Sequence, residues 1–368
     1  MTMPRSKYVQ EGKEGVYHCF SRCVRRAFLY GYDTLTHRDF SHRKTWLVNR
    51  LKQLAGIFAV EVCAYAIMGN HYHTILRTRP DIVAGWSDRE VATRWLALCP
   101  QRNKSRVPVK PTVEEQIRAL VLCPERIETL RKRLSSLSWF MGRLNEFIAR
   151  AANKEDDVKG RFWESRFQCQ ALLDDAAIAT GMVYVDLNPI RAGMAGTPEG
   201  SDFTSIQERI RAWQKEMIVS ASPGKSVQVS RFGSPSEDES MLENTYKFSL
   251  KNTARSDSWL CPIASNTHKR GILPMSATEY FDLVDRSGRM VRADKKGAID
   301  TDLASILKRI GPNPDTWSET ITRFGYKFNL VAGMISSLRN FADQVGKRWF
   351  KGIAAARVAF VTSPPQLT

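Results

Sequence analysis

Two histidines, His71 and His73, occupy alternate positions in the stretch MGNHYHTILR. On a β-strand, side chains two residues apart point to the same face and lie roughly 7 Å apart, so both imidazoles could bind one divalent ion. More often, however, a short His-x-His pattern consists of strand histidines that hydrogen-bond to their neighbours. A metal site therefore needs a further ligand and a reacting group from elsewhere in the chain.

Tyr184 and Asn188 are candidates for these two roles. They lie four residues apart in MVYVDLNPIRAG (182–193), so they share one face of a predicted helix that ends before Pro189. The alternative is that Tyr184 is a core aromatic residue and Asn188 a helix-end residue, which is the simpler explanation of either residue alone.

The charge of the chain favours a polyanionic partner. Its 55 Lys and Arg residues against 38 Asp and Glu residues give a net charge of +17 and a pI near 9.7. Basic side chains release counterions from a phosphate backbone, so this excess indicates nucleic-acid binding, with a merely soluble basic protein as the alternative. No apolar run approaches the roughly 20 residues that span a bilayer, so we expect no membrane partner.

The 7 cysteines are scattered and form no Cys-x-x-Cys pair, which predicts reduced thiols rather than disulfides or a zinc site. The N-terminal stretch MTMPRSKYVQEGKEG lacks the apolar core of a signal peptide. Both features predict a cytoplasmic protein.

The first half of the chain carries the pattern β-α-β-β-α-β, followed by a further helix. We expect strands at 15–22, 59–68, 71–77 and within 160–173, and helices at about 38–56, 124–152 and 174–187. This order predicts an α+β fold, namely a ferredoxin-like antiparallel sheet with helices on one side.

Three segments stand apart from this pattern. Residues 79–125, with several X-Pro steps, predict a helical insertion within a first domain that covers 1–215. Residues 216–258 are rich in Ser, Pro, Gly and charge, which is typical of a linker. Residues 259–368 predict a smaller, mostly helical C-terminal module.

Together these motifs resemble the single-tyrosine HUH transposases, in which a His-hydrophobic-His strand accompanies a tyrosine on a later helix and an amide four residues on. Within that group, SWFMGRLNEFIARAAN, GRFWESRF and YVDLNPIRAG resemble the REP-associated tyrosine transposases. The resemblance runs from about Tyr17 to Ala195. Tyr72 replaces the more usual aliphatic residue between the histidines, and the insertion and the region after about 215 have no counterpart in short members.

The resemblance implies a HUH domain that cleaves and rejoins single-stranded DNA at hairpin-bearing repeats. Tyr184 would attack the scissile phosphate and form a 5′-phosphotyrosine. His71, His73 and Asn188 would hold Mg²⁺ or Mn²⁺. The partner would be single-stranded or hairpin DNA, and the protein a monomer or a homodimer.

Basic side chains interleaved with aromatic rings are typical of single-stranded DNA binding. The candidate DNA-binding residues are Arg22, Arg25, Arg26, Lys159, Arg161, Phe162, Trp163, Arg166 and Arg191. The alternative is a solvated surface for the basic residues and core packing for the two aromatic residues.

Three other functions fit parts of the sequence. They are a domesticated DNA-hairpin-binding protein that has lost cleavage, a zinc metalloprotein built on the histidine pair, and a general RNA-binding protein. A zinc site would need cysteine or histidine partners that the sequence does not supply. A covalent protein–DNA adduct would separate the transposase from all three.

Overall fold

The computed structural model describes residues 4–24, 29–33, 37–99, 112–221, 259–291, 302, 307–308 and 310–360. Of the predicted linker, 216–258, residues 222–258 lie outside the described residues. Residues 216–221 belong to the helix α9 (Ser205–Ala221).

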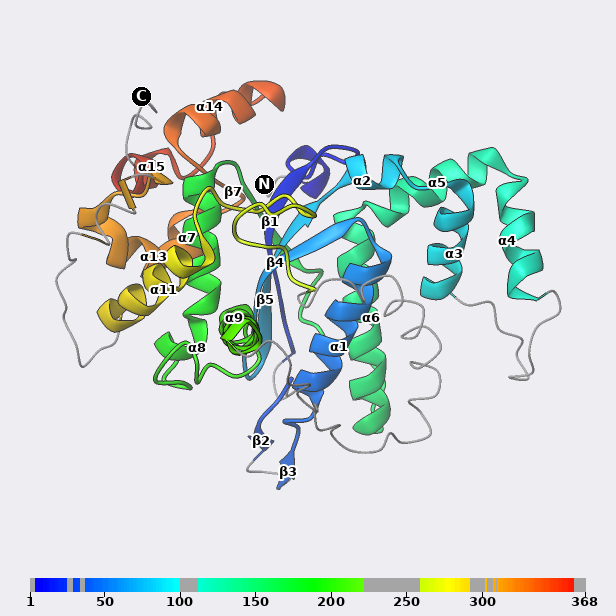
Figure 1. The fold of residues 1–368 in the computed structure, drawn as a ribbon, viewed down its shortest axis with the longest axis horizontal. Helices are drawn as coiled ribbons and strands as arrows, with labels where there is room; N and C mark the ends of the chain where they lie inside the picture. The colour runs from blue at the N-terminus through cyan, green and yellow to red at the C-terminus, as the bar shows by residue number, and fades with distance from the viewer. Residues whose placement is uncertain are drawn as a thin grey trace.

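A five-stranded sheet crosses the middle of the molecule (Figure 1). Its order is β4-β5-β1-β6-β7, and the strands are β1 (Gly15–Arg22), β4 (Val60–Ile67), β5 (His71–Thr78), β6 (Gln168–Leu172) and β7 (Val331–Ala332). The first four strands are antiparallel, and β7 pairs with β6 in parallel. The α+β class is confirmed, and the strands of the first half take the order that a ferredoxin-like β-α-β-β-α-β pattern requires.

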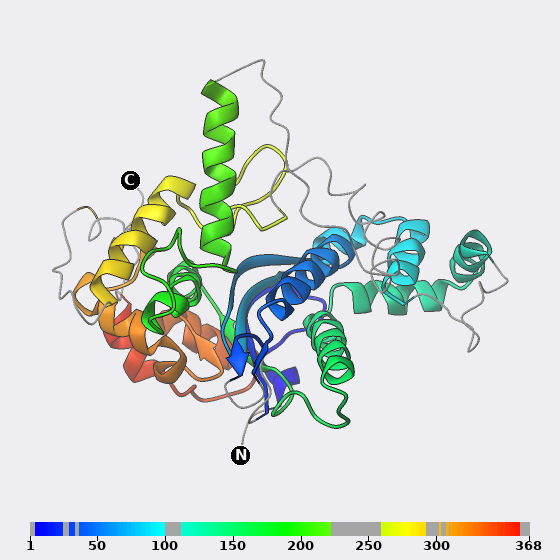
Figure 2. The same cartoon turned by 90° about the horizontal axis from the view of Figure 1, so that it is seen from below.

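The helices α1 (Arg43–Ile57) and α6 (Leu137–Glu155) lie on one side of the sheet, as predicted, and pack against each other (Figure 2). Their apolar stripes are fully buried, because residues at spacings of three and four face the sheet. The helix α1 begins five residues later than predicted, since Arg38–Asp39 forms β3, which pairs with β2 (Tyr32–Asp33).

The single long helix predicted over 124–152 is wrong. The chain forms α5 (Pro124–Leu134) and α6, separated by Ser135 and Ser136. The Ser136 hydroxyl accepts a hydrogen bond from the Trp139 backbone N–H and so caps α6. Serine favours such a cap over a helix interior because its side chain competes for backbone groups.

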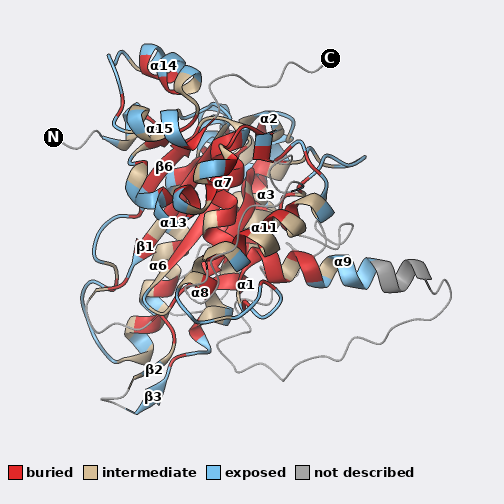
Figure 3. Ribbon diagram, turned by 90° about the vertical axis from the view of Figure 1, so that its left-hand side faces the viewer, coloured by how far each residue is buried: buried red, intermediate tan, exposed pale blue. Residues whose placement is uncertain are grey.

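The helix α7 (Asp175–Asp186) covers the opposite face of the sheet, and α8 (Asn188–Arg191) continues beyond it. Asp174 caps α7 by accepting a hydrogen bond from the Ala177 N–H at 3.0 Å, which confirms the predicted start of this helix at about residue 174. Figure 3 shows that buried residues concentrate along the strands and α7, so this helix forms the centre of the second layer.

The insertion supplies α2 (Pro80–Ala84), α3 (Asp88–Leu98) and α4 (Val113–Val121), which pack with α5 at one end of the molecule. The C-terminal part supplies α11 (Ala277–Val291), α13 (Trp317–Lys327), α14 (Ile335–Gln344) and α15 (Ile353–Ala359). Two short 3-10 turns, Arg5–Lys7 and Pro314–Thr316, complete the described elements. Within the described parts of the chain, no helix is long and apolar enough to cross a membrane.

The C-terminal part is joined to the sheet at several points. The strand β7 extends the sheet beside β6, and α13 packs on α7. At the other edge, the Cys261 N–H donates to the Val62 carbonyl of β4 at 2.9 Å. The described residues of this part therefore share the core of the first half.

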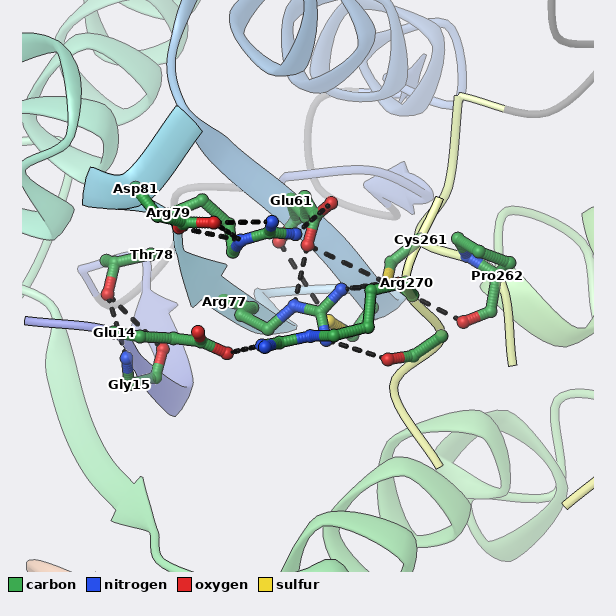
Figure 4. Close-up of polar contacts among 12 residues, drawn as sticks. Glu14, Gly15, Glu61, Arg77, Thr78, Arg79, Asp81, Cys261, Pro262 and Arg270 are labelled. Carbon is green, nitrogen blue, oxygen red and sulfur yellow. Dashed lines mark hydrogen bonds and ion pairs between the residues drawn. The ribbon is translucent and has the colours of Figure 1, made fainter. Parts of the chain in front are cut away.

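A buried guanidinium holds residues 261–271 against the sheet (Figure 4). Arg77 Nε donates to Glu61 at 2.6 Å, and its two terminal nitrogens donate to the carbonyls of Gly271 at 2.8 Å and Arg270 at 2.7 Å. The Arg77 side chain is only 3% exposed, so these bonds form away from water, where an unpaired partner is costly.

We predict that Arg77→Met lowers the free energy of unfolding by about 1–3 kcal/mol, because it leaves the buried carbonyls of Arg270 and Gly271 without their donor, while Glu61 keeps its ion pair with Arg79. Chemical denaturation measures this change, and hydrogen exchange should show loss of protection at 261–271. Arg289→Met, which removes an exposed arginine from α11, is the control and should leave the midpoint unchanged. Equal effects of the two substitutions would contradict the role given to Arg77.

Candidate metal and tyrosine site

The central position of β1 adds a third histidine to the predicted pair. His18 lies on the same face of the sheet as His73, and its Nε2 is 2.9 Å from His73 Nδ1. The two rings stack with centroids 5.1 Å apart, and both side chains are buried. One nitrogen of His73 is therefore already occupied by a neighbour within the protein.

His71 stands at the start of β5, with its ring edge-on to His73 at 5.1 Å between centroids. Its Nδ1 lies 2.7 Å from Oδ1 of Asn70, which as an amide oxygen can only accept. His71 therefore carries its proton on Nδ1 and presents Nε2 as a lone pair. A ligating histidine usually has this arrangement, with one nitrogen held by a neighbour and the other free for an ion.

All three imidazoles are held neutral. Burial lowers the pKa of His18 to about 4, and the Gln170 side chain partly opposes this. Burial and then the charge of Arg22 lower the pKa of His71 to about 4. The pKa of His73 lies well below its usual value through burial, the neighbouring His18 and His71, and the charges of Arg191 and Arg22. The neutral imidazole is the form that binds metal ions.

Tyr184 of α7 meets this cluster from the other layer. Its ring is edge-on to both His18 and His73, with 5.7 Å between centroids in each case. The Tyr184 hydroxyl lies against Gly325 of α13, where an added Cβ would be 3.2 Å from it. The sheet histidines and the helix tyrosine, predicted separately from the sequence, thus come together within one chain.

Arg191 is the cation nearest to this phenol among the described contacts. Its guanidinium carbon lies 5.1 Å from the Tyr184 ring centroid, and Nη2 donates to the Thr322 carbonyl at 2.6 Å. The other terminal nitrogen, Nη1, is buried and has no hydrogen-bond partner. A buried donor without a partner beside a tyrosine is a position at which an anion would be stabilised.

The residues fit a divalent ion only if an amide completes the site. Across the described ranges, no group of three or more His, Cys, Asp or Glu side chains is arranged to hold a metal ion. Asn188 begins α8 one turn after Tyr184, and its Nδ2 donates to the Tyr184 carbonyl at 3.1 Å. That bond assigns Nδ2 as the donor and leaves Oδ1 as an acceptor, and an amide oxygen is a type of atom that can bind a divalent ion.

The predicted DNA-binding residues fall into different environments. Arg22 ends β1 directly opposite His71, with its side chain exposed. Exposed positions are also taken by Lys159, Arg161 and Arg166. Arg25 and Arg26 lie outside the described residues.

The two predicted aromatic DNA contacts are less exposed than these basic residues. Phe162 is 3% exposed. Trp163 is half-buried, and its Nε1 donates to the Asn145 carbonyl at 2.9 Å. For Phe162 in particular, the burial favours core packing over stacking on a base.

His18, Gln170 and the contacts from α13 are not among the residues predicted from the sequence. His18 lies in the predicted strand GVYHCFSR. In a ferredoxin-like sheet this strand pairs with the strand that carries His71 and His73, so a third histidine in the sheet could have been anticipated. Gly325 carries no comparable signal, because its contact depends on how α13 packs on α7.

Comparisons with known proteins give a distant likeness of fold. No family model matches the chain, and no curated protein matches it. A solved structure described as "Structure of the REP associates tyrosine transposase bound to a REP hairpin" is similar over 64% of this chain and 98% of that one, with 12% identity and a TM-score of 0.32. These values describe a distant structural relationship.

The buried histidines predict a specific dependence of stability on pH. In the unfolded chain a histidine titrates near about 6.5, whereas His18 and His71 titrate at about 4 in the folded protein. Between these values the unfolded state binds more protons, so the free energy of unfolding should fall as the pH drops from about 6.5 towards 4. Denaturant unfolding at several pH values measures this slope.

His18→Gln should reduce the fall in stability between about pH 7 and pH 5, because one of the buried imidazoles is gone. His268→Gln removes an exposed histidine and is the matched control, with the wild-type slope expected. Identical slopes for His18→Gln and the wild type would show that His18 is not held neutral.

Proposed function

We propose that this protein is a metal-dependent transposase that cleaves and rejoins single-stranded DNA through Tyr184, at hairpin-bearing repeats. The observation that carries the proposal is the contact of the Tyr184 ring with His18 and His73, each at 5.7 Å between centroids. A phenol and two neutral imidazoles from two different layers of the fold lie in contact there, which supports a tyrosine nucleophile next to a metal ion. The charge of +17 supports a nucleic-acid partner.

His71 and His73 would hold Mg²⁺ or Mn²⁺ through Nε2, with Oδ1 of Asn188 as an oxygen ligand. When bound, such an ion would supply polarisation of a phosphate oxygen and neutralisation of its charge in the transition state. The low pKa of the imidazoles keeps them unprotonated, so an ion would not have to displace protons from them near neutral pH.

In the proposed reaction, Oη of Tyr184 attacks phosphorus, and the bond from phosphorus to the 3′ oxygen breaks. The phenol loses its proton to solvent, the leaving 3′ oxygen gains one, and the 5′ phosphate remains on the tyrosine. Because a phenolate is also a good leaving group, a 3′ hydroxyl can attack the phosphorus of the phosphotyrosine and release the tyrosine. This reversibility suits strand transfer better than hydrolysis.

The arginines beside the cluster would position the DNA strand. The unpartnered Nη1 of Arg191 could donate to a phosphate oxygen next to Tyr184. Arg22, exposed opposite His71, could contact the flanking DNA backbone. A domesticated DNA-hairpin-binding protein would use the same arginines without forming an adduct, so adduct formation separates the two functions.

We expect Tyr184→Phe to abolish the covalent protein–DNA adduct while it leaves DNA binding within a few-fold of the wild type. The substitution removes only the hydroxyl and keeps the ring contacts. The assay incubates the full chain with labelled hairpin oligonucleotides and Mn²⁺, and detects the adduct on a denaturing gel.

Tyr326→Phe is the matched control, because Tyr326 is also a tyrosine close to the cluster along α13 but is 88% exposed. It should form the adduct as the wild type does. An adduct that persists in Tyr184→Phe would exclude Tyr184 as the nucleophile. Hairpin binding without any adduct in the wild type would favour the domesticated binder.

Gly325→Ala should separate activity from stability. Alanine is favoured over glycine inside a helix by about 0.5–1 kcal/mol, so the free energy of unfolding should hold or rise. The new Cβ would lie 3.2 Å from the Tyr184 hydroxyl and displace it by a few tenths of an ångström. We therefore expect slower adduct formation without loss of stability.

Gly142→Ala in α6, where an added Cβ meets nothing within 4 Å, is the control and should react at the wild-type rate.

A further inference from the structure

A line of three buried side chains leads from the C-terminal part of the chain to the proposed metal ligand. Gln170 of β6 lies directly opposite His18 of β1, and His18 contacts His73 of β5. Their exposed fractions are 4%, 2% and 6%, so none of the three exchanges its hydrogen bonds freely with water. The orientation of one side chain therefore constrains the next.

The orientation of the Gln170 amide is fixed by backbone groups. Its Nε2 donates to the carbonyls of Phe328 at 2.6 Å and Asn329 at 3.1 Å. Carbonyls only accept, so the nitrogen must face them and Oε1 must face away. Oε1 is buried and makes no hydrogen bond of standard geometry, although it belongs to a side chain directly opposite His18. Because buried polar atoms normally have a hydrogen-bond partner, we infer that Oε1 of Gln170 accepts a hydrogen bond from the imidazole of His18.

This acceptor sets the proton positions along the line. If His18 keeps its proton on Nδ1, towards Gln170, its Nε2 has the lone pair and must accept from His73 Nδ1–H. His73 then carries its proton on Nδ1 and presents an unprotonated Nε2. The reverse arrangement would put the proton of His73 on Nε2, where it would block an ion.

We propose that Gln170 and His18 are positioning residues that hold His73 in the tautomer required for metal binding, and that the carbonyls of Phe328 and Asn329 set this tautomer. The inference rests on the proposed function for its metal ion. It gives the C-terminal part of the chain a direct role in the chemistry, because two of its backbone groups determine which nitrogen of His73 is available.

The first test is spectroscopic and needs neither metal nor DNA. In full-length protein with ¹⁵N-labelled histidine, the nitrogen shifts of neutral His73 should show a protonated Nδ1 and a bare Nε2. His18→Leu removes the acceptor and should give a mixture of both tautomers. A wild-type His73 with its proton on Nε2 would overturn the proposal.

The second test measures Mn²⁺ binding to the full chain by electron paramagnetic resonance. His18→Leu should weaken binding by about 10–100-fold, as loss of an outer hydrogen bond to a ligating histidine does. His18→Gln places an amide oxygen near the former Nε2 and should restore binding to within a few-fold. Equal affinities of the leucine and glutamine variants would contradict the positioning role.

If His18→Leu does not fold, Gln170→Met provides the same comparison from the next position along the line. It removes the acceptor that faces His18, and both tautomers of His73 should then appear in the nitrogen spectrum. A single protonated Nδ1 in that variant would exclude control by Gln170. Both readouts are independent of catalysis. If His73 has its proton on Nδ1 in the wild type but the protein forms no DNA adduct, only the proposed function is rejected. If the protein forms the adduct but His18→Leu has the wild-type tautomer and Mn²⁺ affinity, only the positioning role of Gln170 and His18 is rejected.

Discussion

The pairing of β1 between β5 and β6 is the constraint on which the candidate site depends. It places His18 directly opposite Gln170 on one side and diagonal to His73 on the other. Because strand side chains alternate, a shift of one residue would turn His18 towards α6 and leave His73 without its neighbour. Long-range hydrogen bonding of the sheet thus fixes the chemistry of side chains that lie far apart in the sequence.

The second layer completes the site from both halves of the chain. The helix α7 brings Tyr184, and α13 closes over it with Gly325, while the Thr322 carbonyl holds Arg191. The segment after α13 then holds Gln170 through two carbonyls. The C-terminal part, which the sequence presents as a separate helical module, therefore contacts Tyr184, Arg191 and Gln170.

Local periodicity explains what could be predicted. Alternation on a strand places His71 and His73 on one face whatever the strand pairs with, and the helical repeat does the same for Tyr184 and Asn188. Burial is harder to predict, because an apolar ring such as Phe162 has the same sequence signature in a core and on a DNA-binding surface. The break at Ser136 was missed because its cap depends on one hydroxyl within an otherwise continuous helical pattern.

Contacts over long sequence separations could not be predicted at all. The Phe328 carbonyl that fixes Gln170 lies 158 residues away in sequence, and a backbone carbonyl has no residue type to recognise. The buried bonds of Arg77 to the carbonyls of Arg270 and Gly271 have the same character. Where a side chain meets the backbone of a distant segment, only the folded chain reveals the partner.

The short parallel strand β7 has a consequence for any shortened form of this protein. It pairs with Ala171 and Leu172 of β6, and removing residues 259–360 would leave those backbone groups as an open sheet edge. Such an edge recruits strands from other copies, so oligomers or aggregates of a shortened fragment would reflect exposed β6 rather than native association. Assembly of this protein is therefore best measured on the intact chain.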